Sequence, residues 1–245
     1  MRVERDGSVL RVTLARPDRR NAFDAALIAE LAAAFVDVGR ARAVVLSGEG
    51  ASFCAGADVE WMRASVGLSF EENVADANAM RQMFEAVDRC PAPVAARVQG
   101  HALGGGAGLV AAADIAIAAS DAVFAFSEAK LGIIPAVVSP FVLAKIGPGA
   151  ARRYFVTGER FDAETALRIG LVSEIARDLD RAVDNVVGEL LSAGPHAARW
   201  AKRLVRERPA GQETARWIAE RRASEEGQEG LKAFLEKRPA AWRAS

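Results

Sequence analysis

The 245-residue sequence predicts an α/β protein with a helical carboxy-terminal end. Three observations support this prediction. Short apolar runs of strand length alternate with longer segments of helical periodicity, three consecutive glycines join one apolar run to an alanine-rich segment, and the residues after about 177 become charged with apolar positions at helical spacing. A chain of this length can bury a sizeable core without disulfides or a structural metal. We expect a core domain over residues 1–190 and a helical region over residues 191–245.

The chain begins with a predicted hairpin and an amphipathic helix. Residues 3–4 and 9–14 alternate between apolar and polar positions around a turn at Asp6-Gly7, as hairpin strands do. Asp24 is a candidate N-cap, because apolar side chains follow it at helical spacing before Gly39. The first helix is therefore expected between these two residues.

The next predicted elements are a strand, a loop of small residues and a long helix. The strand covers residues 43–46, and the loop follows at 47–58. Small residues let a loop bring its backbone against a ligand. Ser69 and Glu72 have the spacing of a capping box, and apolar residues then continue at helical spacing until Pro91.

The glycine run at 104–106 organises the whole prediction. It follows an apolar run at 94–98, predicted as a buried strand, and precedes a predicted helix that extends to Ala113. A strand, a glycine loop and a helix start bind anions through free amide groups. The spacing of a dinucleotide-binding loop fails, since its last glycine would be Leu109, and no Gly-Lys-Ser/Thr follows as a P-loop requires. Glycines that only let a helix pack tightly on its strand are the structural alternative.

The remaining segments complete the α/β pattern. We expect strands at 115–119, 123–126 and 171–175, a loop at 128–135, and helices from Ser139 onward that stop at Gly158 and Gly170. Trp200, Trp217 and Trp242 provide more aromatic surface than a small helical appendage needs. This surplus favours a subunit interface over simple packing on the core.

The composition excludes several classes of partner. The 32 basic and 32 acidic residues balance, so no general field attracts nucleic acid or a membrane surface, and a small-molecule partner is expected. Cys54 and Cys90 have neither metal-ligand spacing nor a disulfide-rich context, so we expect no metal site and a cytoplasmic location. The amino terminus has no apolar region typical of a secretory signal.

Six motifs follow one another along nearly the whole chain. They are FCAGAD at 53–58, GHALGGGAGL at 100–109, AAADIAIAA at 111–119, FAFSEAKLGIIPA at 124–136, ARRYFVTGERFDAETALRIGLV at 151–172 and EGLKAFLEKRPAAW at 229–242. Together they resemble the enoyl-CoA hydratase/isomerase family, the crotonase superfamily. The resemblance implies a spiral of strand-strand-helix (ββα) units, followed by helices that assemble trimers, often paired into hexamers. The segments at 59–62, 69–77 and 129–142 are most similar to the methylglutaconyl-CoA hydratases of leucine catabolism.

The resemblance also implies a reaction site made of two backbone amides and a carboxylate. In this family two N–H groups stabilise negative charge on the thioester oxygen, and they correspond here to those of Ala57 and Gly105. Losing one such donor typically costs about 3–4 kcal/mol. A glutamate at the position of Glu128 gives or takes a proton, which contributes about 10²–10⁴ in rate.

The implied substrate is an acyl-CoA thioester. Coenzyme A is then part of the substrate, and no separate cofactor is expected. By the resemblance, the substrate-binding residues are Ala22, Phe23, Ala55, Gly104, Gly108 and Ala136, with Lys232 and Phe234 toward the nucleotide end.

One position departs from the pattern of the family. Its hydratases usually present a second glutamate in the helix after the glycine run, where this sequence has Gly108. The candidates to replace that carboxylate are Glu60, Glu71, Glu72 and Asp76. A methylglutaconyl-type substrate also carries its own carboxylate, and the candidate cations to hold it are Arg63 and Arg81.

These observations favour a hydratase that adds or removes water across the Cα–Cβ double bond of an enoyl-CoA thioester, with Glu128 as acid and base. An isomerase that moves the double bond between the Δ3 and Δ2 positions with Glu128 alone is the nearest alternative. A noncatalytic acyl-CoA-binding relative is the alternative from another class. Structural roles as anchors, caps or small packing residues are expected for His101, Cys54, Asp58 and Asp114.

Overall fold

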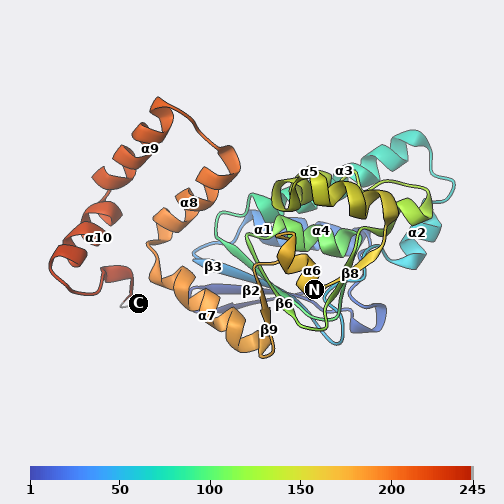
Figure 1. Ribbon diagram of the computed structural model, residues 1–245, viewed down its shortest axis with the longest axis horizontal. Coiled ribbons are helices and arrows are strands. Elements are labelled where there is room, and N and C mark those ends of the chain that lie inside the picture. Colours follow the sequence, from blue (N-terminus) through green and yellow to red (C-terminus); the bar gives the residue numbers. More distant parts are fainter. Residues whose placement is uncertain (244–245) are drawn as a thin grey trace. The chain divides into compact units, whose positions relative to one another are not determined.

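The computed structural model describes residues 1–243, and these form nine strands in two sheets (Figure 1). The six-stranded sheet has the order β1-β2-β3-β4-β6-β9, and the three-stranded sheet has the order β5-β7-β8. The strands are β1 Arg2–Asp6, β2 Val9–Leu14, β3 Ala43–Gly48, β4 Val94–Val98, β5 His101–Leu103, β6 Ile115–Ala119, β7 Val123–Ala125, β8 Arg160–Asp162 and β9 Glu174–Ala176.

The helices follow or separate these strands. They are α1 Ala25–Val36, α2 Val59–Ser65, α3 Phe70–Asp88, α4 Gly105–Ala112, α5 Ser139–Thr157, α6 Ala163–Arg168, α7 Leu179–Ser192, α8 Pro195–Glu207, α9 Gln212–Ala223 and α10 Glu225–Leu235. Short 3-10 turns cover Pro17–Arg19, Ser127–Leu131 and Ala241–Arg243.

From β4 to β7 the consecutive strands alternate between the two sheets, and this produces the spiral. The hairpin β1–β2 is antiparallel, and every other neighbouring pair in the large sheet is parallel. β4 joins the large sheet while β5 joins the small one, and the next pair, β6 and β7, divides in the same way. The α/β class with ββα units is therefore confirmed.

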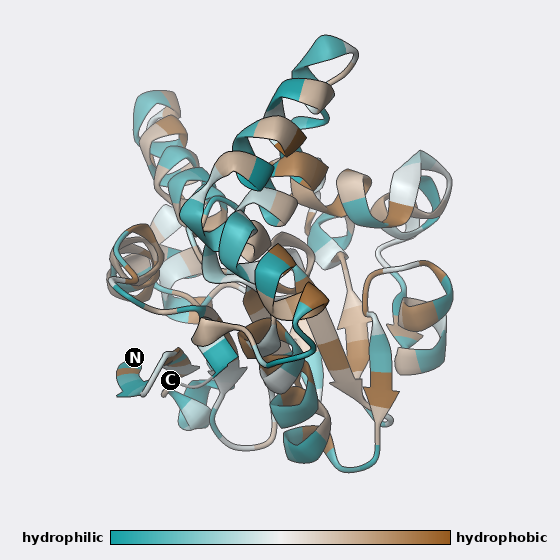
Figure 2. Cartoon of the chain, turned by 90° about the vertical axis from the view of Figure 1, so that its left-hand side faces the viewer, coloured by the Kyte–Doolittle hydropathy of each residue, from teal (hydrophilic) through white to brown (hydrophobic). Residues whose placement is uncertain are grey.

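Small apolar residues fill the space between strands and helices. Figure 2 shows hydrophobic colour along central strands and mixed colours along many helices, as amphipathic helices require. Helices α1, α3, α4 and α5 pack on one another in sequence, and Phe84 joins them. Its ring lies 6.4 Å from that of Phe23, just before α1, and 5.9 Å from that of Phe141 in α5.

Several predicted end signals are confirmed. Asp24 accepts a hydrogen bond from Leu27 N at 2.9 Å, and Ser69 forms both bonds of its capping box. Asp114 accepts from Val94 N at 2.7 Å and so links the starts of β4 and β6.

Five boundaries or short elements differ from the prediction. The first helix ends at Val36, earlier than Gly39, and β5 and β8 were not predicted. The last strand, expected at 171–175, lies at Glu174–Ala176, and the expected loop at 128–135 begins as a 3-10 turn. Each unpredicted strand has three residues, which is too short for a periodic pattern.

The chain divides into two compact units, Met1–Asp184 and Asn185–Ser245. In the second unit the rings of Trp200 and Trp217 meet edge to face at 5.0 Å, and the Arg203 guanidinium lies over both. Trp242 Nε1 donates to Ser192 O at 3.1 Å. All three tryptophans therefore make contacts inside their own unit. Within residues 1–243, no helix combines the length and the apolar character that crossing a membrane requires.

Replacing Ser69 by alanine removes the hydroxyl that accepts from Glu72 N at the start of α3, while the backbone N–H of residue 69 can still donate to Glu72. We expect Ser69→Ala to lower the free energy of unfolding by about 1 kcal/mol and to speed hydrogen exchange in the first turn of α3. Ser173→Ala, at an exposed serine, is the control and should change stability by less than about 0.5 kcal/mol. Equal stability of the two variants in urea denaturation would contradict the assigned cap.

Candidate active site

The loop after β3 contacts β5, just before the glycine run, through backbone hydrogen bonds. Cys54 N donates to His101 O at 3.0 Å, and Leu103 N donates to Cys54 O at 3.0 Å. Gly106 permits this approach, because a Cβ at that position would overlap Cys54 O. The loop after β3 and the glycine run are therefore joined.

Phe23 lies beside both residues, Ala57 and Gly105, whose amides the resemblance assigned to the thioester oxygen. Phe23 N donates to Gly56 O at 2.8 Å and Phe23 O accepts from Asp58 N at 2.7 Å, so the two bonds flank Ala57. The Phe23 ring lies against Gly105, where a Cβ would be 3.2 Å from Cδ2 of that ring.

The N–H groups of Ala57 and Gly105 have no protein acceptor among the described residues. Gly105 is the first residue of α4, so its amide is one of those a helix start leaves unpaired. The two loops are close here, since a Cβ on Gly56 would lie 3.8 Å from Gly105 N. Two free donors near a helix start favour binding of negative charge.

Strand pairing brings Glu128 to the same place. β5 and β7 are parallel in register, and Gly104 N donates to Ala125 O at 2.8 Å, so the turn after β7 meets the turn after β5. A Cβ on Gly104 would lie 3.4 Å from Glu128 Oε1. Glu128 Oε2 is buried, and no group of residues 1–243 donates to it. Burial raises the pKa of this carboxyl above its usual range.

Gly108 lies under apolar side chains. A Cβ at this position would overlap Val138 Cγ1 and lie 3.0 Å from Phe84 Cε1. Val138 is buried and precedes α5, and Phe84 belongs to α3. The position of the usual second glutamate is thus filled from two neighbouring helices, and Glu128 is the carboxylate that lies beside the glycine run.

The four candidate replacements for that glutamate have different surroundings. Glu60 forms an ion pair with Arg63 at 2.7 Å, Glu72 belongs to the capping box, and Glu71 is exposed. Asp76 is half-buried on α3, and burial raises the pKa of its carboxyl.

Both candidate cations for holding a substrate carboxylate already form ion pairs. Arg63 has the partner just named, and Arg81 pairs with Glu85 at 2.7 Å, one helical turn further along α3. Both are exposed pairs within single helices. Such pairs contribute little to stability, so their geometry does not exclude a change of partner.

The other predicted binding residues lie in several environments. Ala22 and Phe23 are buried, Ala55 is half-buried, and Ala136 is exposed. In the second unit Lys232 and Phe234 are exposed on α10, and their predicted contact with the nucleotide end stays a prediction.

The residues expected to be structural have contacts of that kind. His101 Nδ1 lies 3.4 Å from Ser52 Oγ. Cys54 is fully buried, and burial raises the pKa of its thiol to about 12, so the reactive thiolate is suppressed. Asp58 caps α2 by accepting from Glu60 N at 2.8 Å.

The family model for enoyl-CoA hydratase/isomerase matches residues 4–245 of this chain. The chain belongs to this family. A probable enoyl-CoA hydratase of Rhodobacter capsulatus is 36% identical over 244 residues, which cover 93% of this chain and 91% of that protein. The family assignment makes the chain an enzyme of the crotonase fold.

Solved structures of the family superpose closely on this chain. The crystal structure of an enoyl-CoA hydratase from Shewanella pealeana is 41% identical and gives a TM-score of 0.92 over 98% of this chain and 94% of that one. Pseudomonas aeruginosa AtuE is 37% identical and gives a TM-score of 0.93 over 98% of each chain.

We predict that Gly108 and Val138 are energetically coupled. Gly108→Glu should lower the free energy of unfolding by about 1–3 kcal/mol, because the new side chain overlaps Val138. Adding Val138→Ala should recover at least about 1 kcal/mol of that loss in a double-mutant cycle measured by urea denaturation. Val156→Ala, at an exposed valine of α5, should combine with Gly108→Glu additively. Additivity in both cycles would exclude the coupling.

A second prediction concerns the stability cost of Glu128. Its pKa is higher in the folded chain than in the unfolded chain, so ionisation above the usual glutamate range disfavours folding. Glu128→Gln should therefore stabilise the protein at pH 7.5 by roughly 1 kcal/mol, about 2–4 °C in Tm. The gain should shrink as the pH falls toward the usual pKa of glutamate, where the acid is neutral in both states.

Thermal melts of Glu128→Gln at pH 7.5 and pH 5 test this sign. Glu174→Gln, at an exposed glutamate of β9, should change stability by less than about 0.5 kcal/mol at either pH. A less stable Glu128→Gln at pH 7.5 would show that the carboxylate is a stabilising group.

Proposed function

We propose that this chain is an acyl-CoA hydratase that adds or removes water across the α,β double bond of an enoyl-CoA thioester. One observation carries the proposal: the buried carboxylate oxygen of Glu128 has no donor within residues 1–243, and it belongs to a group beside the glycine run that supplies a free amide. An uncompensated carboxyl next to free donors suits proton transfer beside a developing oxyanion.

The two amides would stabilise charge on the thioester oxygen. When water attacks Cβ, the electrons of the double bond move through Cα onto this oxygen. Donors fixed in advance, here Ala57 N–H and Gly105 N–H, lower the barrier because they need no reorganisation as the charge forms. The helix dipole of α4 adds positive potential at the same end.

Glu128 would carry the proton. As the water oxygen bonds to Cβ, the carboxylate takes one proton of that water, and the second proton stays on the new hydroxyl. Glu128 then delivers its proton to Cα while the electrons return from the oxygen, which completes the addition of one water. The raised pKa of Glu128 supports both directions, since burial makes the carboxylate a stronger base and eases its return to the neutral acid.

An enoyl-CoA isomerase is the second candidate. The apolar filling at Gly108 supports it, because isomerisation needs a single proton shuttle. In that reaction Glu128 would remove a proton from Cα of a 3-enoyl thioester and return it to Cγ as the double bond moves. No water oxygen enters the product.

The proposal for the substrate has two parts, the class of compound and the exact acyl group. The family supports an enoyl-CoA thioester, and the segments at 59–62, 69–77 and 129–142 support the 3-methylglutaconyl type of leucine degradation. A panel of CoA thioesters with and without a distal carboxylate tests the proposed acyl group. A preference for thioesters without that carboxylate would contradict the methylglutaconyl assignment but would be compatible with a hydratase.

We further propose a homotrimer or homohexamer in a reducing cytoplasm. Exposed apolar side chains of the second unit support assembly: Leu204, Val205, Ile218, Leu231, Phe234 and Leu235. Cys54 and Cys90 are buried and do not form a disulfide, which supports the compartment. Light scattering of the purified protein should give the mass of three or six chains. The mass of a single chain would contradict the proposed assembly.

We predict that Glu128→Gln lowers kcat by about 10²–10⁴ and leaves thioester binding nearly unchanged, because the amide groups of the site are untouched. Turnover and binding of the best panel substrate are the measurements. Full turnover of this variant would remove Glu128 from the chemistry.

Labelled water separates the two reactions. With crotonyl-CoA or its 3-enoyl isomer in ¹⁸O-water, a hydratase incorporates the label into a 3-hydroxyacyl product. An isomerase yields a shifted double bond without ¹⁸O. The second result would replace the hydratase proposal by the isomerase.

A further inference from the structure

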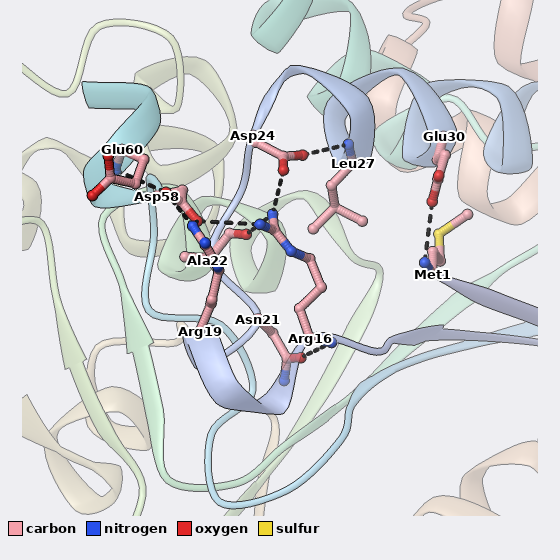
Figure 3. Close-up of polar contacts among 10 residues, drawn as sticks. All are labelled: Met1, Arg16, Arg19, Asn21, Ala22, Asp24, Leu27, Glu30, Asp58 and Glu60. Atoms are coloured by element: carbon pink, nitrogen blue, oxygen red, sulfur yellow. Dashed lines mark hydrogen bonds and ion pairs between the residues drawn. The ribbon is translucent and has the colours of Figure 1, made fainter. Parts of the chain in front are cut away.

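Asp58, the residue after Ala57, is a buried carboxylate held by two arginines (Figure 3). Its side chain is 4% exposed. Arg19 Nη1 donates to both carboxylate oxygens, at 3.2 and 2.9 Å, and Arg16 Nη2 donates to Oδ2 at 3.2 Å. The hydrogen bond from Arg19 is the main reason that the pKa of Asp58 lies below its usual range, so the group stays ionised near neutral pH.

The turn that supplies these arginines is itself fixed. Arg20 and Asn21 both have left-handed backbones, with φ of 51° and 56°, which non-glycine residues seldom adopt. Asn21 is completely buried and holds the turn by accepting from Arg16 N at 2.9 Å and donating to Glu49 O and Ser52 O. Through Asn21, the loop that leads toward Ala57 therefore fixes the backbone of Arg16 from which its side chain extends.

Arg16 also reaches the segment around Phe23. Its Nη1 donates to Ala22 O at 2.9 Å and pairs with Asp24 Oδ2 at 2.8 Å. One guanidinium thus connects both neighbours of Phe23 to Asp58 (Figure 3). Since Phe23 brackets Ala57 through two backbone bonds, the orientation of the Ala57 amide depends on this set of contacts.

From this arrangement we infer that Asp58 is a positioning residue for the reaction, which, with Arg16 and Arg19, fixes the direction of the Ala57 amide toward the thioester oxygen. This inference rests on the proposed function. Capping α2 requires only the acceptor for Glu60 N, so the two arginines exceed the need of a cap. Transition-state stabilisation by an amide requires that the donor be held in advance, because a shift of about 1 Å costs about 10²-fold in rate.

Asp58→Asn is the sharpest variant. Asparagine has the same shape and keeps an acceptor for Glu60 N, but it loses the charge that pairs with two guanidinium groups. We expect kcat for the best panel substrate to fall by about 10- to 100-fold and KM to change by less than about 3-fold. The acid limb of the pH–rate profile should stay in place, since Glu128 is unchanged.

The absorption spectrum of bound cinnamoyl-CoA distinguishes a positioning role of Asp58 from a merely structural one. Hydrogen bonds to its thioester oxygen shift its absorption to longer wavelength, so the size of the shift in the bound state reports on the amides. Asp58→Asn should bind this probe and lose most of the shift. The matched control is Asp162→Asn, the N-cap of α6, which accepts from Thr165 N at 2.8 Å and should keep both shift and kcat.

Arg19 provides a second test if Asp58→Asn does not fold, as judged by circular dichroism. The Arg19 side chain is 47% exposed, so Arg19→Met leaves the core intact while removing the two-oxygen contact. Arg19→Met should lose the spectral shift, and Arg19→Lys should retain part of it. A folded Asp58→Asn or Arg19→Met with wild-type kcat and shift overturns the inference. A wild-type protein that neither turns over thioesters nor shifts the probe overturns the proposed function instead.

Discussion

The backbone contact between residues 53–56 and residues 99–106 is the constraint on which the first unit depends. Phe53 N donates to Gln99 O at 2.8 Å, and Cys54 continues the pairing with donor and acceptor bonds of its own. These bonds join the connection after β3 both to the turn before β5 and to β5 itself, through an isolated bridge between Cys54 and Ala102. A side chain at Gly106 would separate the two segments. The small residues of both motifs are therefore required by chain packing before any ligand is considered.

The proposed site brings unpaired polar groups of the backbone and of a carboxyl side chain close together. Helix starts are capped by Asp24, Ser69 and Asp162, whereas the start of α4 has no side-chain cap. Nearby, Glu128 keeps one buried oxygen without a donor from residues 1–243. Groups of this kind cost folding free energy, and they are retained where chemistry uses them. Stability and the proposed chemistry are thus in opposition at this place.

The parts of the fold that depend on local signals were predictable. The hairpin, the capping box and the cap at Asp24 each follow from residues within a few positions of one another. The short strand β5 was not predictable, because its pairing is with β7, about twenty residues further on. The family resemblance supplied that architecture where periodicity could not.

The site was predictable to the same extent. Motifs predicted Glu128, Ala57 and Gly105 as parts of the proposed site, but they did not predict the partners of Asp58, although the polar turn was evident. Arg16 and Arg19 precede Asp58 by 42 and 39 residues, and no sequence pattern links such positions. The sequence signal for such a contact is a turn rich in arginine, followed later in the chain by an acidic residue at the end of a loop of small residues.

The filling of Gly108 has an evolutionary consequence. In a lineage with this core, a second acid gained at that position by one substitution would lower stability, because Val138 and Phe84 occupy the space. A smaller residue at 138 that arises first would remove much of this cost. The order of the mutational steps would then affect whether a descendant of this chain can acquire a carboxylate at position 108.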